Sequence, residues 1–197
     1  MADSSAKYRA IGTIKDEHRS ISAVLHGMLH LMRTARQRQA KPNFAVLRGM
    51  VYYLDSFSER LHHPKEDNCV YATLRCRTAE ANALLMEVEQ QHAEGAKLIR
   101  DLEQSLLRYE QGGPAQLPEF DKVVRGYAEF HWNHMRMEED RILPLAEKFL
   151  TEGDWEMIAQ AFEANGDPLF GLERDDEFRA LFTRIVNMAP APIGLGS

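Results

Sequence analysis

One arrangement of histidine and glutamate occurs twice in this chain, and it constrains the fold more than any other feature of the sequence. Each copy has a lone histidine, then a second histidine 44 or 42 residues later, then a glutamate four residues beyond that. The copies are His18, His62 and Glu66, and His92, His134 and Glu138. Four residues turn a helix by about 400°, so each His-x-x-x-Glu places both side chains on one face, about 6 Å apart. The fold should therefore bring four helix faces to a common centre.

Apolar residues recur at helical spacing along most of the chain, and strand signals are nearly absent. Gln39–Asn43 and the run Gly112-Gly113-Pro114 interrupt this pattern. The predicted long helices are 13–38, 44 to the seventies, 78–110 and 118–149. Long helices joined by short breaks favour an all-α fold, an antiparallel up-down four-helix bundle. Pro64 and Pro144 fall inside the second and fourth helices, where each should cause a kink or local loosening.

The 197 residues suit one domain with flanking segments. We expect one or two short accessory helices after the bundle, at 155–164 and 175–188. The tail is rich in proline and glycine and is expected to be disordered. The expected divisions are an N-terminal extension at 1–12, the bundle at 13–150, accessory helices at 151–188 and the tail at 189–197.

Charge and composition favour a soluble cytoplasmic protein. A formal net charge of -6 argues against a nucleic-acid partner, because phosphate binding requires clustered lysine and arginine. The sequence has no signal-peptide pattern, and no apolar run approaches the ~20 residues of a membrane span, so no membrane association is expected. The two cysteines, Cys69 and Cys76, fit a reducing compartment and match neither a redox pair nor a zinc spacing.

The six repeated residues have the chemistry of a metal site. All four histidines fall on or beside predicted inward-facing stripes, and burying four imidazoles and two acids without a compensating ligand would be costly. A carboxylate one turn from a histidine could bridge two metal ions while the imidazole binds one of them. A single histidine on an apolar stripe is more often an ordinary core residue, but two matching sets on four helices favour coordinated metal. Mixed imidazole and carboxylate ligands suit iron, manganese or zinc.

Two further histidines have several interpretations. On a regular helix, His63 points about 100° away from His62, which favours an outward or supporting position, although Pro64 could turn it inward. His131 lies one turn before His134 and could be an extra ligand or a donor to one. Its counterpart in the other half is Glu59.

The sequence resembles the hemerythrin-like, or HHE cation-binding, family across about its first 150 residues. The stretches that carry the resemblance are Asp16-Glu17-His18, Leu61 to Asp67, Gln91-His92 and His134 to Pro144. The resemblance implies a left-twisted four-helix bundle and a carboxylate-bridged di-iron site, with two iron ions per chain.

The chain departs from the oxygen-carrying hemerythrins in two places. Those proteins have a fifth histidine one turn after the third-helix ligand, where this chain has Ala96, and His-x-x-x-x-Asp on the last helix. The more symmetric set is similar to di-iron proteins linked to iron–sulfur repair and nitrosative stress, and to domains that sense iron and oxygen. Simple oxygen transport is therefore not favoured.

The sequence leaves three classes of function open. One is a non-haem di-iron protein that handles oxygen, nitric oxide, peroxide or iron, in a stress response or in repair, with a redox partner protein. Another is a module that binds or senses oxygen or iron reversibly without turnover. The third is a metal-free interaction bundle, which is disfavoured because all six ligand-type residues are present.

Overall fold

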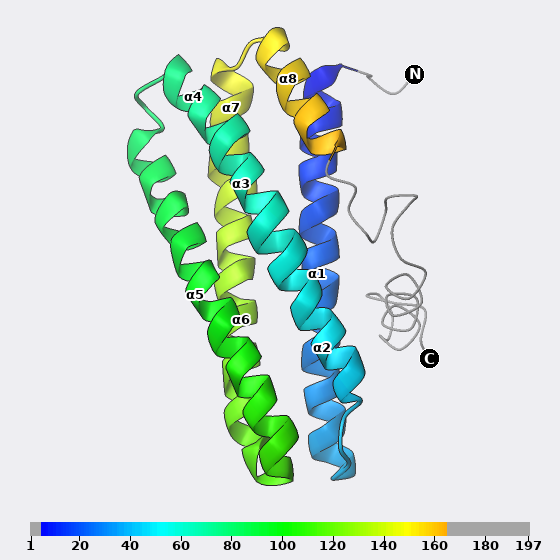
Figure 1. Cartoon of the computed structure of the whole chain (residues 1–197). Helices are drawn as coiled ribbons and strands as arrows, with labels where there is room; N and C mark the ends of the chain where they lie inside the picture. The colour runs from blue at the N-terminus through cyan, green and yellow to red at the C-terminus, as the bar shows by residue number, and fades with distance from the viewer. Residues whose placement is uncertain (1–4, 165–197) are drawn as a thin grey trace.

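In the computed structural model, which describes residues 5–164, four long helices lie side by side in alternating directions (Figure 1). The first is α1 (Ala6–Arg38), and the third is α5 (Asn82–Gly112). The second runs without interruption through α2 (Phe44–Tyr53), a π-helical segment Leu54–His62, α3 (His63–Lys65), a second π-helical segment Glu66–Tyr71 and α4 (Ala72–Arg77). The fourth comprises α6 (Leu117–Met137), a π-helical segment Glu138–Ile142 and α7 (Leu143–Phe149).

Short connections with specific backbone conformations reverse the chain between helices. Gln39 ends α1 with a left-handed backbone, φ 48°, and its N–H donates to the carbonyl oxygen of Ala35. Asn43 caps α2 by accepting a hydrogen bond from the backbone N–H of Val46. Gly113, with φ 70°, ends α5 before a single 3-10 turn (Gly113–Gln116), and a positive φ is a conformation that glycine adopts at little cost. Such tight breaks place consecutive helices antiparallel.

The two ligand-bearing helices contain π-helical turns close to their internal prolines. Pro64 lies between two such segments, and Pro144 follows directly after Glu138–Ile142 and Leu143. A proline removes one backbone donor and crowds the carbonyl four residues earlier, and a wider turn relieves that crowding. The loosening expected at both prolines thus takes the form of π-helical turns within continuous helices.

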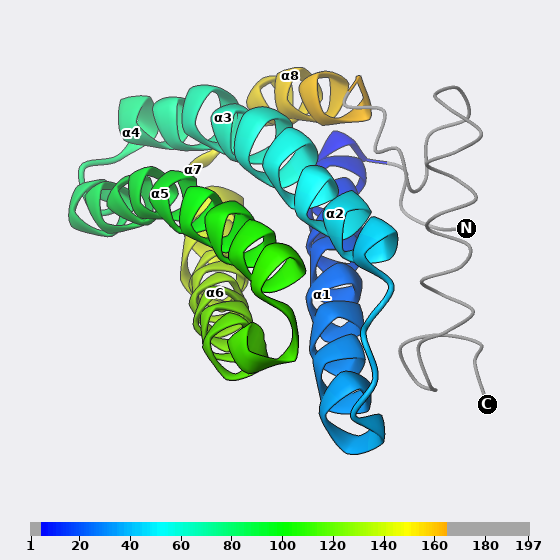
Figure 2. The same ribbon diagram turned by 60° about the horizontal axis from the view of Figure 1, so that its bottom comes forward.

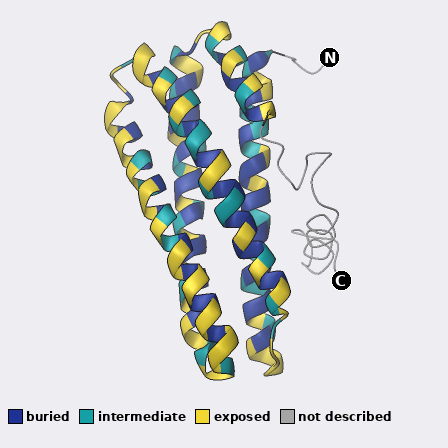
Figure 3. Cartoon of the chain, viewed as in Figure 1, coloured by how far each residue is buried: buried dark blue, intermediate teal, exposed yellow. Residues whose placement is uncertain are grey.

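The buried residues form two apolar clusters separated by a polar layer. One cluster fills the half of the bundle that contains Leu25, Leu54, Leu102 and Val124, and the other fills the half that contains Leu85. Figure 3 shows the buried positions on the inward faces of the helices and the exposed positions outside. The repeated histidines and glutamates belong to the polar layer between the clusters, where they are buried.

A further helix, α8 (Glu152–Glu163), covers the N-terminal part of α1 and contacts the second π-helical segment (Figure 2). A capping box of Thr151 and Asp154 starts the helix. Its inner face buries Trp155 and Phe162 in the second apolar cluster. Arg9 of α1 forms ion pairs with the exposed acids Glu156 and Glu163 at its outer edge. This helix is therefore part of the apolar core.

The all-α bundle predicted from the sequence is confirmed, with local differences in helix bounds. The first helix begins at Ala6 and not at Thr13. The accessory helix expected from Trp155 begins at Glu152, because its capping box lies before that tryptophan. The helix expected at 175–188 and the tail at 189–197 lie outside the described residues. Within residues 5–164, no helix combines the length and apolar character that a membrane crossing needs.

Candidate metal centre

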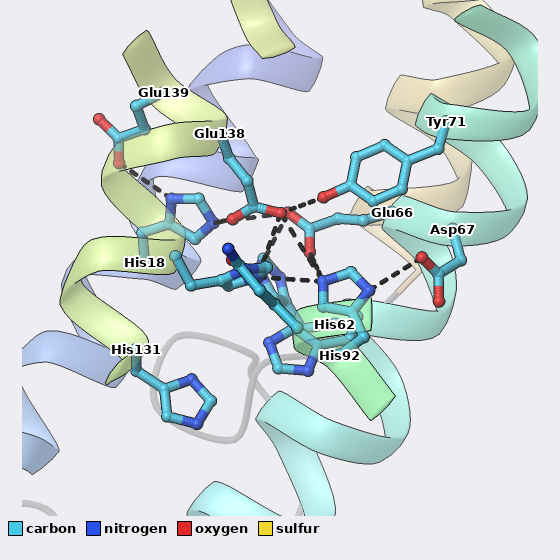
Figure 4. A network of polar contacts seen from close by, with 12 residues as sticks. His18, His62, Glu66, Asp67, Tyr71, His92, His131, Glu138 and Glu139 are labelled. Carbon is cyan, nitrogen blue, oxygen red and sulfur yellow. Dashed lines mark hydrogen bonds and ion pairs between the residues drawn. The ribbon is translucent and has the colours of Figure 1, made fainter. Parts of the chain in front are cut away.

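All six repeated residues converge inside the polar layer, as Figure 4 shows for the five of them that it labels. They come from all four long helices, and each is at most 7% exposed. Three of them lie at the ends of the π-helical segments, where the helix departs from regular α geometry: His62, Glu66 and Glu138. The sequence repeat thus becomes one buried cluster in three dimensions.

The first half of the cluster joins His18 and His62 to one oxygen of each glutamate. Glu66 Oε1 lies 3.5 Å from His18 Nε2 and 3.3 Å from His62 Nε2. Glu138 Oε2 lies 3.4 Å from His18 Nε2. Ligand atoms of His18, His62 and Glu66 all fall within 4.8 Å of one another, a spacing that could hold one metal ion. We call this the His18–His62 half.

The second half uses the other oxygen of each glutamate. Glu66 Oε2 lies 3.5 Å from His92 Nε2, and Glu138 Oε1 lies 3.3 Å from His134 Nε2 and 3.8 Å from His92 Nε2. We call this the His92–His134 half. Each glutamate therefore faces both halves at once, which is the arrangement of a carboxylate that bridges two metal ions.

Several inward atoms of the cluster have no hydrogen-bond partner among the described residues. They are the Nε2 atoms of His18 and His62, Glu66 Oε2 and Glu138 Oε2. Buried polar atoms in native proteins are almost always satisfied. A pair of cations at the centre would satisfy all four, so the donor set fits two metal ions.

The outer nitrogen of each of the four imidazoles is held by an acceptor on a different helix. The Nδ1 pairs are His18–Glu139 at 2.9 Å, His62–Glu17 at 2.6 Å, His92–Asp67 at 2.8 Å and His134–Gln91 at 2.8 Å. With Nδ1 donating, Nε2 faces inward with its lone pair free for metal. These bonds also fix the orientation of each ring.

Each of these acceptors is the immediate sequence neighbour of a ligand-type residue on another helix. Asp67 and Glu139 both support an imidazole in this way. Glu17 and Gln91 were not assigned this role by sequence reasoning. The sequence feature that could have identified them is their position directly before a ligand-type histidine. A residue next to an inward ligand points about 100° aside, toward the adjacent helix.

The two halves are related by the sequence repeat, but their surroundings differ. Glu17 and Gln91 occupy matching positions, so His62 donates to a carboxylate and His134 to a neutral amide. The hydroxyl of buried Tyr71 donates to Glu138 Oε1. The repeat therefore gives similar ligands and unequal electrostatics.

The carboxylates around the first half hold protons on its imidazoles. Burial lowers the pKa of His18, but the hydrogen bond to Glu139 and the nearby carboxylates of Glu66 and Glu138 outweigh it and raise this pKa to about 9. Burial likewise lowers the pKa of His62, yet the charge of Glu66 and the bond to Glu17 raise it to about 10. In the metal-free protein both rings are thus cationic near neutral pH.

In the second half, one imidazole has a raised pKa and the other a lowered pKa. Burial opposes charging of His92, but its hydrogen bond to Asp67 and the nearby carboxylates of Glu138 and Glu66 raise its pKa to about 12. Burial, reinforced by His63 and His92, lowers the pKa of His134 to about 3 despite the nearby Glu138. Protonated His92 accordingly donates to the neutral His134 ring, with 3.0 Å between their Nε2 atoms. A metal ion that binds here must displace protons.

Two further histidines lie beside the second half. His63 does not point outward, as regular helical counting favoured, but is buried with its ring 4.2 Å from that of His92. Its ligand atom falls within 4.8 Å of those of Glu66, His92 and His134. His131 is also buried, but its Nε2 lies 3.3 Å from Glu59, and it belongs to neither ligand group.

A cavity of about 430 Å³ opens between α1 and α6, beside the first half. His18 and Glu139 are among the residues that line it, so it reaches the edge of the cluster. The lining residues are His18, Arg19, Ser22, His26, Trp132, Met135, Arg136, Glu139 and Asp140. Ligand pockets of this size accommodate small molecules.

Comparison with known proteins agrees with this geometry. A family model described as the hemerythrin HHE cation binding domain matches residues 9–146, which include all six repeated residues. No curated protein and no solved structure matches the chain.

Proposed function

The chain belongs to the hemerythrin HHE cation-binding family, and on that premise we propose that it holds two iron ions and handles oxygen, nitric oxide, peroxide or iron itself. Cation binding follows from the family and from the histidine and glutamate clusters. Iron, a count of two, and a role in a stress response or in iron–sulfur repair are the proposal.

The observation that carries the proposal is the position of the two buried glutamates. Each directs one oxygen to the His18–His62 half and the other to the His92–His134 half. A single ion would leave two imidazoles and one oxygen of each glutamate without a partner. Two ions use the entire donor set, and imidazole with carboxylate oxygen suits iron, with manganese or zinc as alternatives.

Bound iron would supply reversible one-electron chemistry and coordination positions for a small molecule. The chain's own residues orient and protect it. Four acceptors hold the imidazoles with Nε2 inward, and the two apolar clusters exclude bulk water from either side. The cavity beside His18 supplies a route for a small molecule to reach the first half.

A sensing module without turnover is the second candidate, and the placement of α8 favours it. Phe162 packs its ring edge on His62 with 6.1 Å between centroids, and the Lys65 ammonium donates to the carbonyl oxygen of Ala161 at 2.5 Å. If metal loading or oxidation moves His62, these contacts would therefore shift α8 as well. A partner protein could read that change.

The test is anaerobic reconstitution with ferrous iron, followed by exposure to dioxygen, nitric oxide and peroxide in turn. We expect about two iron ions per chain in the wild type and a large loss in a His62→Ala, His134→Ala double variant. His30→Ala, which alters a half-buried histidine away from the cluster, is the matched control. Repeated consumption of one molecule supports a reactive centre, whereas a reversible spectroscopic adduct supports sensing. Fewer than about one ion per wild-type chain would contradict the dinuclear site.

We further propose that the protein works in the cytoplasm with a redox partner protein. Cys69 and Cys76 are both free, which suits a reducing compartment. Labelling of both thiols in protein isolated under native conditions tests the compartment. An intermolecular disulfide at either cysteine would contradict it.

A further inference from the structure

A second buried polar cluster lies directly against the His92–His134 half. It contains Glu59, His63, Tyr127 and His131. Glu59 Oε2 lies 3.3 Å from His63 Nδ1, and Glu59 Oε1 lies 3.3 Å from His131 Nε2. The Tyr127 hydroxyl donates to Glu59 Oε1 at 3.0 Å. None of these four residues belongs to the six repeated residues.

The surroundings of His63 repeat those of the four imidazoles that face the centre. Its ring is buried, and its Nδ1 faces a carboxylate, as in three of those four imidazoles. Among the described residues, the hydrogen-bond contact of its Nε2 is a long one, 3.5 Å from the Ser58 hydroxyl oxygen. With Nδ1 directed to Glu59, Nε2 is the atom left for a metal ion.

The ligand groups around the two halves differ in size because of this side chain. On one side, His18, His62 and Glu66 lie within mutual reach. On the other side, His63 joins Glu66, His92 and His134 in a single group. The ring of His63 packs against both imidazoles there, 4.2 Å from His92 and 5.3 Å from His134 between centroids.

The position of Glu59 is itself determined by its neighbours. Tyr127 and His131 contact its Oε1, which leaves Oε2 for His63. Gly95 of α5 faces the same carboxylate, and a Cβ at that position would lie 3.2 Å from Oε2. The absence of a side chain there makes room for the carboxylate, so three helices cooperate to hold it against His63.

We propose that His63 is a metal ligand of the His92–His134 half, and that Glu59 is the residue that positions it. The two metal positions then differ, with three imidazoles on one and two on the other, although the sequence repeat is symmetric. The more open coordination sphere belongs to the His18–His62 half. This inference rests on the two-metal site of the proposed function.

Paramagnetic proton NMR of the cobalt(II)-substituted protein tests the proposal in the wild type. Each coordinated imidazole keeps an exchangeable Nδ1–H whose resonance the metal shifts far from the diamagnetic range. We expect five such resonances, one each from His18, His62, His63, His92 and His134. Four resonances in protein that holds two cobalt ions would overturn the proposal, and this measurement does not depend on a variant that folds.

Variants then assign the fifth resonance. His63→Gln should remove it and release one cobalt ion to a chelator at least tenfold faster than the wild type. His30→Gln, at a half-buried histidine outside this cluster and outside both ligand groups, should keep five resonances and the wild-type release rate. Glu59→Gln should shift the His63 resonance and leave the other four in place, which a purely structural role would not do. Release from His63→Gln at the wild-type rate would overturn the assignment.

The metal count separates the two proposals. Wild-type protein that holds fewer than two cobalt ions contradicts the dinuclear site itself, and with it the role of His63. Two bound ions with four shifted resonances contradict the role of His63 alone.

Discussion

Replacing Glu17 with glutamine should weaken one metal position and leave the other unchanged. Glu17 accepts the Nδ1–H of His62 at 2.6 Å, and both side chains are almost fully buried. Glutamine fits geometrically, because Gln91 already makes the matching bond to His134 at 2.8 Å. The change therefore removes the negative charge next to His62 Nδ1 and preserves the hydrogen bond that this nitrogen donates.

The expected magnitude follows from the difference between charged and neutral acceptors. A hydrogen bond to a charged group contributes about 1.5–3 kcal/mol, compared with about 0.5–1.5 kcal/mol for a neutral pair. The loss at His62 is then about 1–2 kcal/mol, which corresponds to roughly 5- to 30-fold in affinity, since about 1.4 kcal/mol is tenfold. Both partners are shielded from solvent, so added salt should change the effect little.

The assay is a chelator competition with manganese or ferrous iron that resolves two binding steps. Glu17→Gln should weaken the step at the His18–His62 half about tenfold and leave the other step at its wild-type value. Gln91→Glu should strengthen the step at the His92–His134 half, because it adds the missing charge. Asp16→Asn, which removes the same charge from an exposed neighbour that pairs with Arg19, is the matched control.

The result that would refute this reasoning is a Glu17→Gln protein with both steps within twofold of the wild type. Equal weakening of both steps would also contradict it. Either outcome would mean that the acceptor behind His62 does not tune the metal position that this imidazole faces.

Three further predictions concern stability of the metal-free protein. Phe162→Ala should cost about 3–5 kcal/mol in a urea unfolding experiment, because this ring is 1% exposed inside an apolar cluster; a loss below about 1 kcal/mol would show that α8 is not part of the core. Thr151→Ala should cost about 1 kcal/mol through loss of the α8 capping box, measured in the same way, and an unchanged midpoint would contradict the cap. The raised pKa values of His18, His62 and His92, about 9, 10 and 12, stabilise the fold fully below their ordinary value of 6.5. This stabilisation is lost as pH rises through the raised values, so urea unfolding should show lower stability at about pH 10 than at about pH 6, and the reverse order would contradict the assigned protonation.

Much of the fold follows from local sequence patterns. Apolar spacing and the breaks at Gln39–Asn43 and Gly112–Pro114 predict four helices, and the structure confirms the bundle. The predicted helix ends are less accurate, because caps depend on single residues. Thr151 caps α8, which therefore begins at Glu152, three residues before the start that the periodic pattern suggests. The start of α1 was missed for a related reason, since small residues such as Ala6 and Ala10 are buried there and carry little apolar signal.

The π-helical turns explain where counting along a regular helix failed. At about 100° per residue, His63 should point well away from His62. A π-helical segment ends at His62 and another begins at Glu66, so residues in this region do not keep the regular angular phase. The tertiary structure turns His63 inward, against His92.

The sequence by itself determined the helical class and the six residues that converge on one centre, because a four-residue spacing on a helix has one geometric consequence. Only the tertiary structure decided which acceptor supports each of the four repeated histidines, since each of these four bonds crosses from one helix to another. It also decided that the two halves differ, through Glu17 opposite Gln91 and through Glu59 behind His63. A repeat in the sequence specifies matching ligands, whereas their electrostatic surroundings depend on how the helices pack.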